Sequence, residues 1–174
     1  LGRGDRVALL LPNGPEVIIG YQGILRCGAV IVPVIPSVGG TELGHILNDC
    51  EAAAVITSPE ILSIQKDPFL SAKALKHCIL TGSEPPPGTI PFQSLLEVGT
   101  GDAGNPDIPE RDLAVILYTA GTTWRPKGVM LTHANLYANA VNAAQAHGTK
   151  SSDVTLVALP LSHSFGITTM NKAY

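Results

Sequence analysis

Charged and aromatic residues are both scarce in this chain of 174 residues. Charged residues make up 14% and aromatic residues 5%, whereas about 25% of the residues in a typical soluble domain are charged. The 11 basic residues are outnumbered by 14 acidic ones, so the chain lacks the basic surface that nucleic-acid binding requires. Intrinsic disorder is excluded as well, because the net charge is only −3 and 45% of the residues are hydrophobic.

Long hydrophobic runs and paired cysteines are also missing. The longest apolar run, residues 29–35, contains Pro33 and is far shorter than the ~20 residues that cross a bilayer. We therefore expect no transmembrane segment, while peripheral association with a membrane stays open. Three widely separated cysteines, Cys27, Cys50 and Cys78, indicate neither a disulfide framework nor a zinc site. We expect them to pack in the core of a reduced, cytoplasmic protein.

Short runs rich in Val and Ile alternate with segments of helical spacing. Strands are predicted at residues 6–11, 30–34, 53–57, 77–80, 113–118, 128–131 and 154–159. Such uninterrupted apolar strands, with helices between them, predict an α/β fold: layered, mainly parallel sheets flanked by helices. The loop-rich residues 99–110 are interpreted as a linker between a lobe at 1–98 and a second lobe at 111–174.

Several residues are predicted to begin or end helices. Asn13, with Glu16 three residues later, is the expected N-cap of the first helix, and Gly28 is expected just past its end. Thr41 is the expected cap of the second helix. A further helix is predicted at residues 134–146, with Thr132 as its cap and His133 at its start.

The most informative segment is the loop after the predicted strand at residues 113–118. It reads Tyr-Thr-Ala-Gly-Thr-Thr-Trp-Arg-Pro-Lys-Gly from Tyr118 to Gly128. Its hydroxyls, its backbone N–H groups and the ammonium of Lys127 could together bind a polyphosphate. It is not a Walker loop, because Gly128 rather than Ser or Thr follows Lys127 and a strand rather than a helix is predicted next. We therefore expect a hairpin that carries the loop at its tip.

The loop closely resembles the phosphate-binding signature of the adenylate-forming superfamily, which includes acyl-CoA synthetases, luciferases and peptide-synthetase adenylation domains. It matches nine of the eleven specified positions of the pattern Y-T-S-G-T-T-G-x-P-K-G-V. The segment LPLSHSFG at residues 159–166 is similar to the family's P-L-x-H-x-x-G element, and GDRVALLLPNGPE and GAVIVPVIPS resemble its opening strands. The three matches follow the family's order and span nearly the whole chain.

The resemblance implies an ATP-dependent carboxylic acid–CoA ligase that forms an acyl-adenylate and transfers the acyl group to coenzyme A. It implies ATP, Mg²⁺ and coenzyme A as cofactors or substrates. The residues implied to bind the phosphates of ATP are Thr119, Ala120, Gly121, Thr122, Thr123 and Lys127, with Mg²⁺ reaching Thr122 through a phosphate. His163, Phe165 and Gly166 are implied to line the pocket for the acyl carboxylate. Fatty acids are favoured over aryl acids, because LPLSHSFG looks most like the acyl-CoA synthetase form of the element.

Two departures from the family pattern keep other functions open. Ala120 lacks the hydroxyl of the family's Ser, and Trp124 replaces a Gly that lets the backbone turn freely. One alternative is an adenylation domain that loads a carrier protein; another is a non-catalytic domain that binds a nucleotide or a partner. The chain ends before the family's Y-G-x-T-E and Y-x-T-G-D motifs and before the C-terminal domain with its catalytic Lys. The resemblance thus implies part of a large N-terminal domain, and we expect the chain alone to be inactive.

The high mean hydropathy of +0.25 predicts that the chain exposes apolar surface, because a small domain has much surface to cover with polar groups. We expect self-association through the strands at residues 113–118 and 154–159, with Val115, Leu117, Leu156 and Ala158 near the contact.

Overall fold

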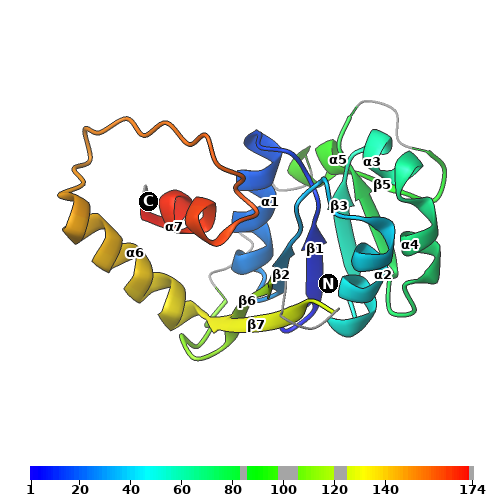
Figure 1. Cartoon of the computed structure of the whole chain (residues 1–174), viewed down its shortest axis with the longest axis horizontal. Helices are drawn as coiled ribbons and strands as arrows, with labels where there is room; N and C mark the ends of the chain where they lie inside the picture. The colour runs from blue at the N-terminus through cyan, green and yellow to red at the C-terminus, as the bar shows by residue number, and fades with distance from the viewer. Residues whose placement is uncertain (83–85, 98–105, 120–124, 173–174) are drawn as a thin grey trace.

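The computed structural model describes residues 1–82, 86–97, 106–119 and 125–172. Helices and strands follow one another from β1 to α7 in the order shown in Figure 1. The strands are β1 (Arg6–Leu9), β2 (Val30–Pro33), β3 (Ala54–Thr57), β4 (His77–Leu80), β5 (Ile90–Pro91), β6 (Leu113–Thr119) and β7 (Lys127–Thr132). The helices are α1 (Pro15–Arg26), α2 (Gly40–Asp49), α3 (Pro59–Ile64), α4 (Lys66–Ser71), α5 (Phe92–Glu97), α6 (His133–His147) and α7 (Ser164–Lys172).

The described strands form one seven-stranded sheet in the order β5-β4-β3-β1-β2-β6-β7. Every neighbouring pair is parallel except β6 and β7, which form the predicted antiparallel hairpin. The predicted α/β fold with a mainly parallel sheet is confirmed. Because β6 pairs with β2, the sheet continues from the strands before the loop-rich residues 99–110 to the strands after them.

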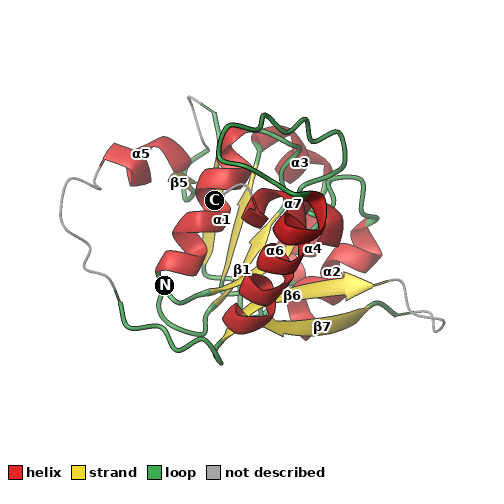
Figure 2. Cartoon of the chain, turned by 90° about the vertical axis from the view of Figure 1, so that its left-hand side faces the viewer, coloured by secondary structure: helices red, strands yellow, loops and turns green. Residues whose placement is uncertain are grey.

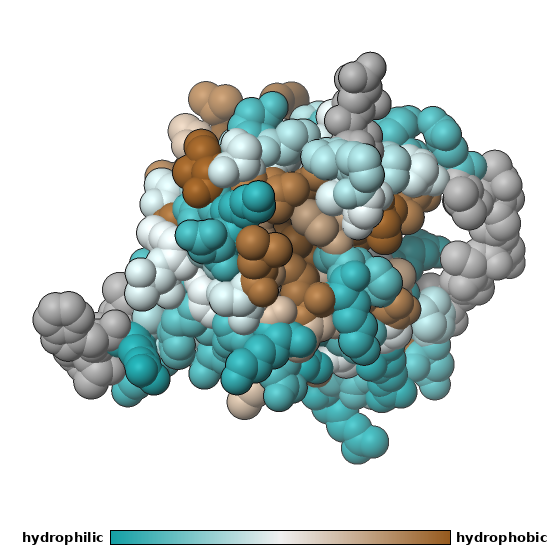
Figure 3. All heavy atoms as spheres, turned by 90° about the vertical axis from the view of Figure 1, so that its right-hand side faces the viewer, coloured by the Kyte–Doolittle hydropathy of each residue, from teal (hydrophilic) through white to brown (hydrophobic). Residues whose placement is uncertain are grey.

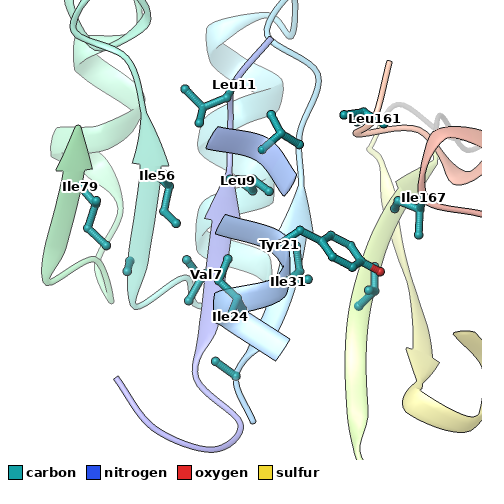
Figure 4. Packing of buried hydrophobic residues seen from close by; sticks show 14 of the residues in the cluster. Val7, Leu9, Leu11, Tyr21, Ile24, Ile31, Ile56, Ile79, Leu161 and Ile167 are labelled. Carbon is teal, nitrogen blue, oxygen red and sulfur yellow. The ribbon is translucent and has the colours of Figure 1, made fainter. Parts of the chain in front are cut away.

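The pleat of the sheet divides the buried residues between two faces. Val7 and Leu9 of β1 face α1, where they pack with Tyr21 (Figure 4), whereas Ala8 and Leu10 face α2. Such alternation follows from the period of two along a strand. The two faces are therefore covered by different helices. The face of α1 also receives α7, and the face of α2 also receives α4.

The connections that follow β1 and β2 lead to strands on opposite sides of β1. After β1 the chain passes through α1 on one face to reach β2, and after β2 it passes through α2 on the other face to reach β3, on the far side of β1. The connections that leave the carboxyl ends of the adjacent strands β1 and β2 therefore run to opposite faces. In open α/β sheets, ligands bind in the crevice at such a point.

The predicted end of α1 and the predicted start of α6 are confirmed. Gly28 follows the C-cap residue of α1 with a φ of +72°, a left-handed conformation that costs Gly less than other residues. Thr132 caps α6, and its side chain and that of Asn135 form a reciprocal capping box. His133 is the first residue of α6.

The predicted caps of the first two helices are wrong. The N-cap residue of α1 is Gly14 and that of α2 is Gly39, neither of which offers a side-chain hydrogen bond. Thr41 lies inside the first turn of α2. Asn13 uses its side chain for a contact with a distant segment, residues 159–161, and is therefore not available to the helix.

The strand predicted at residues 154–159 is also wrong. These residues form an extended connection between α6 and α7, and Val154 and Leu156 are 99% and 92% exposed. A strand needs hydrogen bonds from a neighbouring strand, and the sheet of the described residues ends at β7. The helix α7 that follows was not predicted. Val115 is fully buried between β2 and β7, so it cannot lie at a surface contact as expected.

The cysteines differ in their surroundings. Cys50 is buried as predicted, Cys78 is half-buried, and Cys27, at the end of α1, is exposed, which corrects the expectation of core packing for that residue. Burial raises the pKa of the Cys50 thiol to about 11, so this side chain stays a neutral packing group. In the parts of the chain that the structure describes, no helix combines the length and the apolar character needed to cross a bilayer.

Candidate functional site

The hairpin of β6 and β7 presents the two described members of the predicted phosphate loop. Thr119 is the last residue of β6 and pairs with Lys127, the first residue of β7, and both are exposed. Figure 2 shows the two strands side by side. Their ends therefore hold a hydroxyl and an ammonium group next to each other at the base of the loop. Ala120, Gly121, Thr122 and Thr123, together with Trp124, lie outside the described residues.

Helix α2 supports both strands of this hairpin. The hydroxyl of Tyr118 donates a 2.6 Å hydrogen bond to Asp49 Oδ2 at the end of α2. One turn earlier, the ring of His45 packs edge-on against Tyr118, and its Nε2 lies 3.1 Å from the carbonyl oxygen of Pro126. These contacts fix the backbone immediately before Thr119 and immediately before Lys127.

Gly128 makes room for Tyr118. The two residues face each other across the hairpin, and a Cβ atom at position 128 would lie 2.8 Å from Ile116 Cγ2 and 3.3 Å from the Tyr118 ring. A side chain at this position would push both neighbours away from the strand. Packing of the hairpin therefore requires Gly at position 128, whether or not a ligand binds.

The protonation of Tyr118 is fixed by its surroundings. Burial, and then the hydrogen bond to Asp49, raise the pKa of the phenol above its ordinary value. The hydroxyl therefore remains a donor to the Asp49 carboxylate at neutral pH. Tyr118 holds the hairpin in place, and its one O–H donor is engaged by Asp49.

The second predicted element begins in the connection before α7. His163 and Phe165 are exposed, whereas Gly166 is buried in the first turn of α7. The Nδ1 atom of His163 accepts a 3.4 Å hydrogen bond from the backbone N–H of Phe165. Since Nδ1 is the acceptor, the neutral ring carries its proton on Nε2, and that atom is the one left for a ligand.

Both predicted elements lie at the same edge of the sheet. Thr119 ends β6, whose carboxyl end lies beside that of β2 because the two strands are parallel. Residues 159–161 are bound to Asn13, which follows the carboxyl end of β1. Only β2 separates β1 from β6, which is about 10 Å at the usual spacing of strands. The fold thus places two elements that are about 40 positions apart in the sequence at the same end of the sheet.

A hollow lies at this edge, where the connections after β1 and β2 diverge. Its volume is about 280 Å³, and its walls come from residues 11–13, from residues 35–37, and from Ala158, Pro160 and Ser162. Of the predicted site residues that the structure describes, none lines this hollow or a larger one of about 880 Å³ between α2 and the helices α3 and α4. The smaller hollow lies where ligands bind in open α/β sheets. This position, rather than its volume, makes it the better candidate for a ligand-binding site.

The supporting residues could not be found from the sequence. Asp49 and His45 lie about 70 positions before Tyr118, and their spacing along α2 carries no signal of a contact with a hairpin. Asn13 stands where a helix cap is expected, so its sequence neighbourhood points to a different role. Among the described residues, no group of three or more His, Cys, Asp or Glu side chains could hold a metal ion.

The chain is similar in sequence to known CoA ligases. Residues 1–173 match the family described as AMP-binding enzyme. A long-chain-fatty-acid–CoA ligase of Salmonella typhimurium is 33% identical over an alignment that covers 97% of this chain and 35% of that protein. The chain therefore spans about a third of the length of this curated relative.

Two solved structures share the fold. A long-chain-fatty-acid–CoA ligase from Archaeoglobus fulgidus has a TM-score of 0.87 and 32% identity, with 98% of this chain and 33% of that one covered. ATP-bound MatB from Rhodopseudomonas palustris has a TM-score of 0.81 and 29% identity, with 99% of this chain and 33% of that one covered.

Proposed function

The chain belongs to the AMP-binding enzyme family, and from this premise we propose that it forms part of the nucleotide-binding domain of an ATP-dependent carboxylic acid–CoA ligase. The observation that supports the proposal is the position of two elements at the carboxyl end of the sheet: the hairpin ends at Thr119 and Lys127 follow β6, and the segment before His163 is bound to Asn13 after β1. The first suits a polyphosphate and the second an acyl carboxylate.

Thr119 and Lys127 would bind the β- and γ-phosphates of ATP. The ammonium of Lys127 forms charge-assisted hydrogen bonds to phosphate oxygens, and the hydroxyl of Thr119 donates another. The same role is proposed for residues 120–123, which lie outside the described parts of the chain. Lys127 would also neutralise the charge that grows on the departing pyrophosphate, which is how positioned cations accelerate such reactions.

The proposed reaction has two steps. A carboxylate oxygen forms a bond to the α-phosphorus of ATP as the bond between that phosphorus and the pyrophosphate oxygen breaks. The thiol of coenzyme A then adds to the acyl carbonyl of the resulting acyl-adenylate, loses its proton, and displaces AMP. His163, through Nε2, and the ring of Phe165 would orient the carboxylate for the first step. Mg²⁺ would neutralise phosphate charge; the described side chains form no site for it alone, so it would be held mainly by ATP.

A fatty acid is the proposed substrate. Two observations support it: the resemblance of residues 159–166 to the acyl-CoA synthetase form of the element, and the named activity of the Salmonella and Archaeoglobus relatives. An assay of the full-length protein with palmitate, octanoate and benzoate would test this. A clear preference for benzoate would contradict the fatty-acid assignment without affecting the reaction type.

Carboxylate-dependent exchange of pyrophosphate into ATP, measured on the full-length protein that contains this chain, tests the adenylation itself. Lys127→Ala should lower kcat/KM for ATP roughly 10- to 100-fold, since a hydrogen bond to a charged group contributes about 1.5–3 kcal/mol. Lys127→Arg should retain part of the activity. Lys150→Ala, at another exposed lysine in the connection after α6, is the matched control.

Three outcomes separate the candidate functions. Unchanged ATP kinetics in Lys127→Ala would contradict the phosphate role. Exchange that is followed by acyl transfer to a carrier protein, and not to coenzyme A, would assign the carrier-loading alternative. ATP binding without any exchange would favour a non-catalytic domain, an alternative that the departures at Ala120 and Trp124 from the family pattern keep open.

A further inference from the structure

Asn13 holds a segment that lies almost 150 residues further along the chain. Its Nδ2 donates a 2.9 Å hydrogen bond to the carbonyl oxygen of Leu159, and its Oδ1 accepts a 2.8 Å hydrogen bond from the backbone N–H of Leu161. One amide side chain thus satisfies a backbone acceptor and a backbone donor on either side of Pro160. The planar amide of Asn carries both kinds of group, an NH₂ donor and a carbonyl acceptor.

The other side of this segment rests on the first turn of α7. A Cβ atom at Gly166 would lie 2.7 Å from Leu161 Cα and closer still to the Pro160 carbonyl oxygen, so any side chain larger than hydrogen would displace the segment. Leu161 and Ile167 join the cluster around α1 (Figure 4) and are only 8% and 3% exposed. The segment therefore lies between the Asn13 amide and the backbone of α7, with Leu161 buried and Leu159 48% exposed.

The position of His163 depends on this arrangement. The backbone N–H of His163 donates a 3.0 Å hydrogen bond to the Pro160 carbonyl oxygen, and the His163 carbonyl accepts one of 3.0 Å from Ile167. His163 thus stands between the residue that Asn13 brackets and the first turn of α7. A shift of Leu159 or Leu161 would pass through Pro160 to His163 and Phe165.

From these contacts we infer that Asn13 is a positioning residue for the carboxylate substrate: it fixes residues 159–161 at the carboxyl end of β1 and thereby places His163 and Phe165. The inference rests on the proposed function, because the expected effect on substrate binding assumes that His163 and Phe165 contact the carboxylate. The hairpin of Thr119 and Lys127 is held separately, by Asp49 and His45 of α2. Loss of Asn13 should therefore affect the carboxylate and spare ATP.

The test compares Asn13→Ala and Asn13→Asp with the wild type in the full-length protein. Hydrogen exchange at the Leu161 amide should become about three- to tenfold faster in Asn13→Ala, because a single hydrogen bond has been removed. In steady-state kinetics, KM for the carboxylate should rise roughly tenfold, while KM for ATP stays within about twofold, since small displacements of substrate-positioning groups have large effects on rate.

Asn13→Asp distinguishes positioning from general stability. The carboxylate keeps an acceptor for the Leu161 N–H but loses the donor to Leu159, so this variant should retain Leu161 protection and have an intermediate KM for the carboxylate. Asn142→Ala, at an exposed asparagine of α6, is the matched control and should leave exchange and both KM values unchanged.

The failures of the two proposals are distinguishable. If Leu161 exchange is the same in Asn13→Ala and Asn142→Ala, Asn13 does not hold the segment and the inference is wrong. If exchange accelerates but the two substrates are affected equally, Asn13 stabilises the fold and positions nothing. A full-length protein without adenylation would contradict the proposed function, and the exchange rate at Leu161 would still decide whether Asn13 holds the segment.

Discussion

Tyr118 shows how a residue inside a ligand-binding signature can have a structural task. Its ring covers Gly128 on the opposite strand, and its hydroxyl reaches Asp49 on α2. The two residues of the signature, Tyr and Gly, therefore form one packing unit that fixes the hairpin. The phosphate-binding groups proposed beside them, Thr119 and Lys127, remain exposed at its ends.

Replacement of Tyr118 by Phe should remove the hydrogen bond and keep the packing. We expect the free energy of unfolding to fall by about 1 kcal/mol, the usual net value of one hydrogen bond, because Asp49 is exposed and water can take the place of the hydroxyl. Urea unfolding followed by circular dichroism measures this. Tyr137→Phe, at a tyrosine that is 73% exposed, should change stability by less than about 0.5 kcal/mol.

The same variant should also alter the dependence of stability on pH. The folded-state pKa of Tyr118 lies above the unfolded value of about 10, so the unfolded chain releases this proton first as pH rises. The contribution of Tyr118 is therefore complete below about pH 10 and declines above it. Equal stability losses above pH 10 in the wild type and in Tyr118→Phe would contradict the assigned protonation.

At the scale of elements, the two extended segments of the second half behave differently. Residues 113–119 form β6 between two neighbouring strands, whereas residues 154–159, with a similar apolar pattern, form no strand in the described structure. Sequence pattern reports whether side chains suit a strand, but a strand also needs a partner for its backbone. The partner is a property of the whole fold, which explains why one prediction is confirmed and the other is wrong.

A matched pair of leucines tests this difference. Leu10 is fully buried under α2, and Leu156 is 92% exposed. We expect Leu10→Ala to lower the free energy of unfolding by about 2–5 kcal/mol, the range for core leucines. Leu156→Ala should change it by less than about 0.5 kcal/mol. Both values come from urea titration of the 174-residue chain; a large loss in Leu156→Ala would mean that residues 154–159 are packed.

How much of the fold the sequence predicts depends on the range of the interactions involved. Local signals are read correctly: the apolar runs of β1 to β4, Gly28 past α1, and Thr132 before α6 all act within a few residues. Asn13 fails because a distant segment competes for its side chain. In the candidate site, the motif predicts Thr119 and Lys127 at one hairpin base, whereas their supports Asp49 and His45 arise only from tertiary packing.

At the scale of the whole molecule, exposed apolar residues gather at two ends of the sheet. One end has an apolar groove of about 500 Å³ between α1 and α5, and Figure 3 shows hydrophobic residues on the face at this end. At the other end lie β7, α6, α7 and the connection between them (Figure 1). We propose that residues 99–110 link two lobes that contribute strands to this one sheet, because β6 pairs with β2.

The β7 end combines two features that promote association. Met130, 69% exposed, lies on β7, which is the outermost strand of the described sheet, and Val154, Leu156 and Phe165 are exposed in the segments that follow α6. An edge strand offers unpaired backbone groups, and apolar side chains beside it add a hydrophobic driving force. Val115, buried inside the sheet, is replaced as a predicted contact by Met130, whereas Leu156 remains one.

We therefore expect the 174-residue chain to self-associate through the β7 end, with a sedimentation coefficient that rises with concentration. Met130→Lys should shift the equilibrium toward monomer, because a charge on an edge strand opposes pairing with another strand and is costly to bury. Leu70→Lys is the matched control: Leu70 lies on α4 and is 75% exposed, so the same change in charge there should leave association unaltered. An equal effect of the two variants would assign association to net charge rather than to β7. A wild-type chain that sediments as a monomer at all concentrations would contradict association through the edge strand β7.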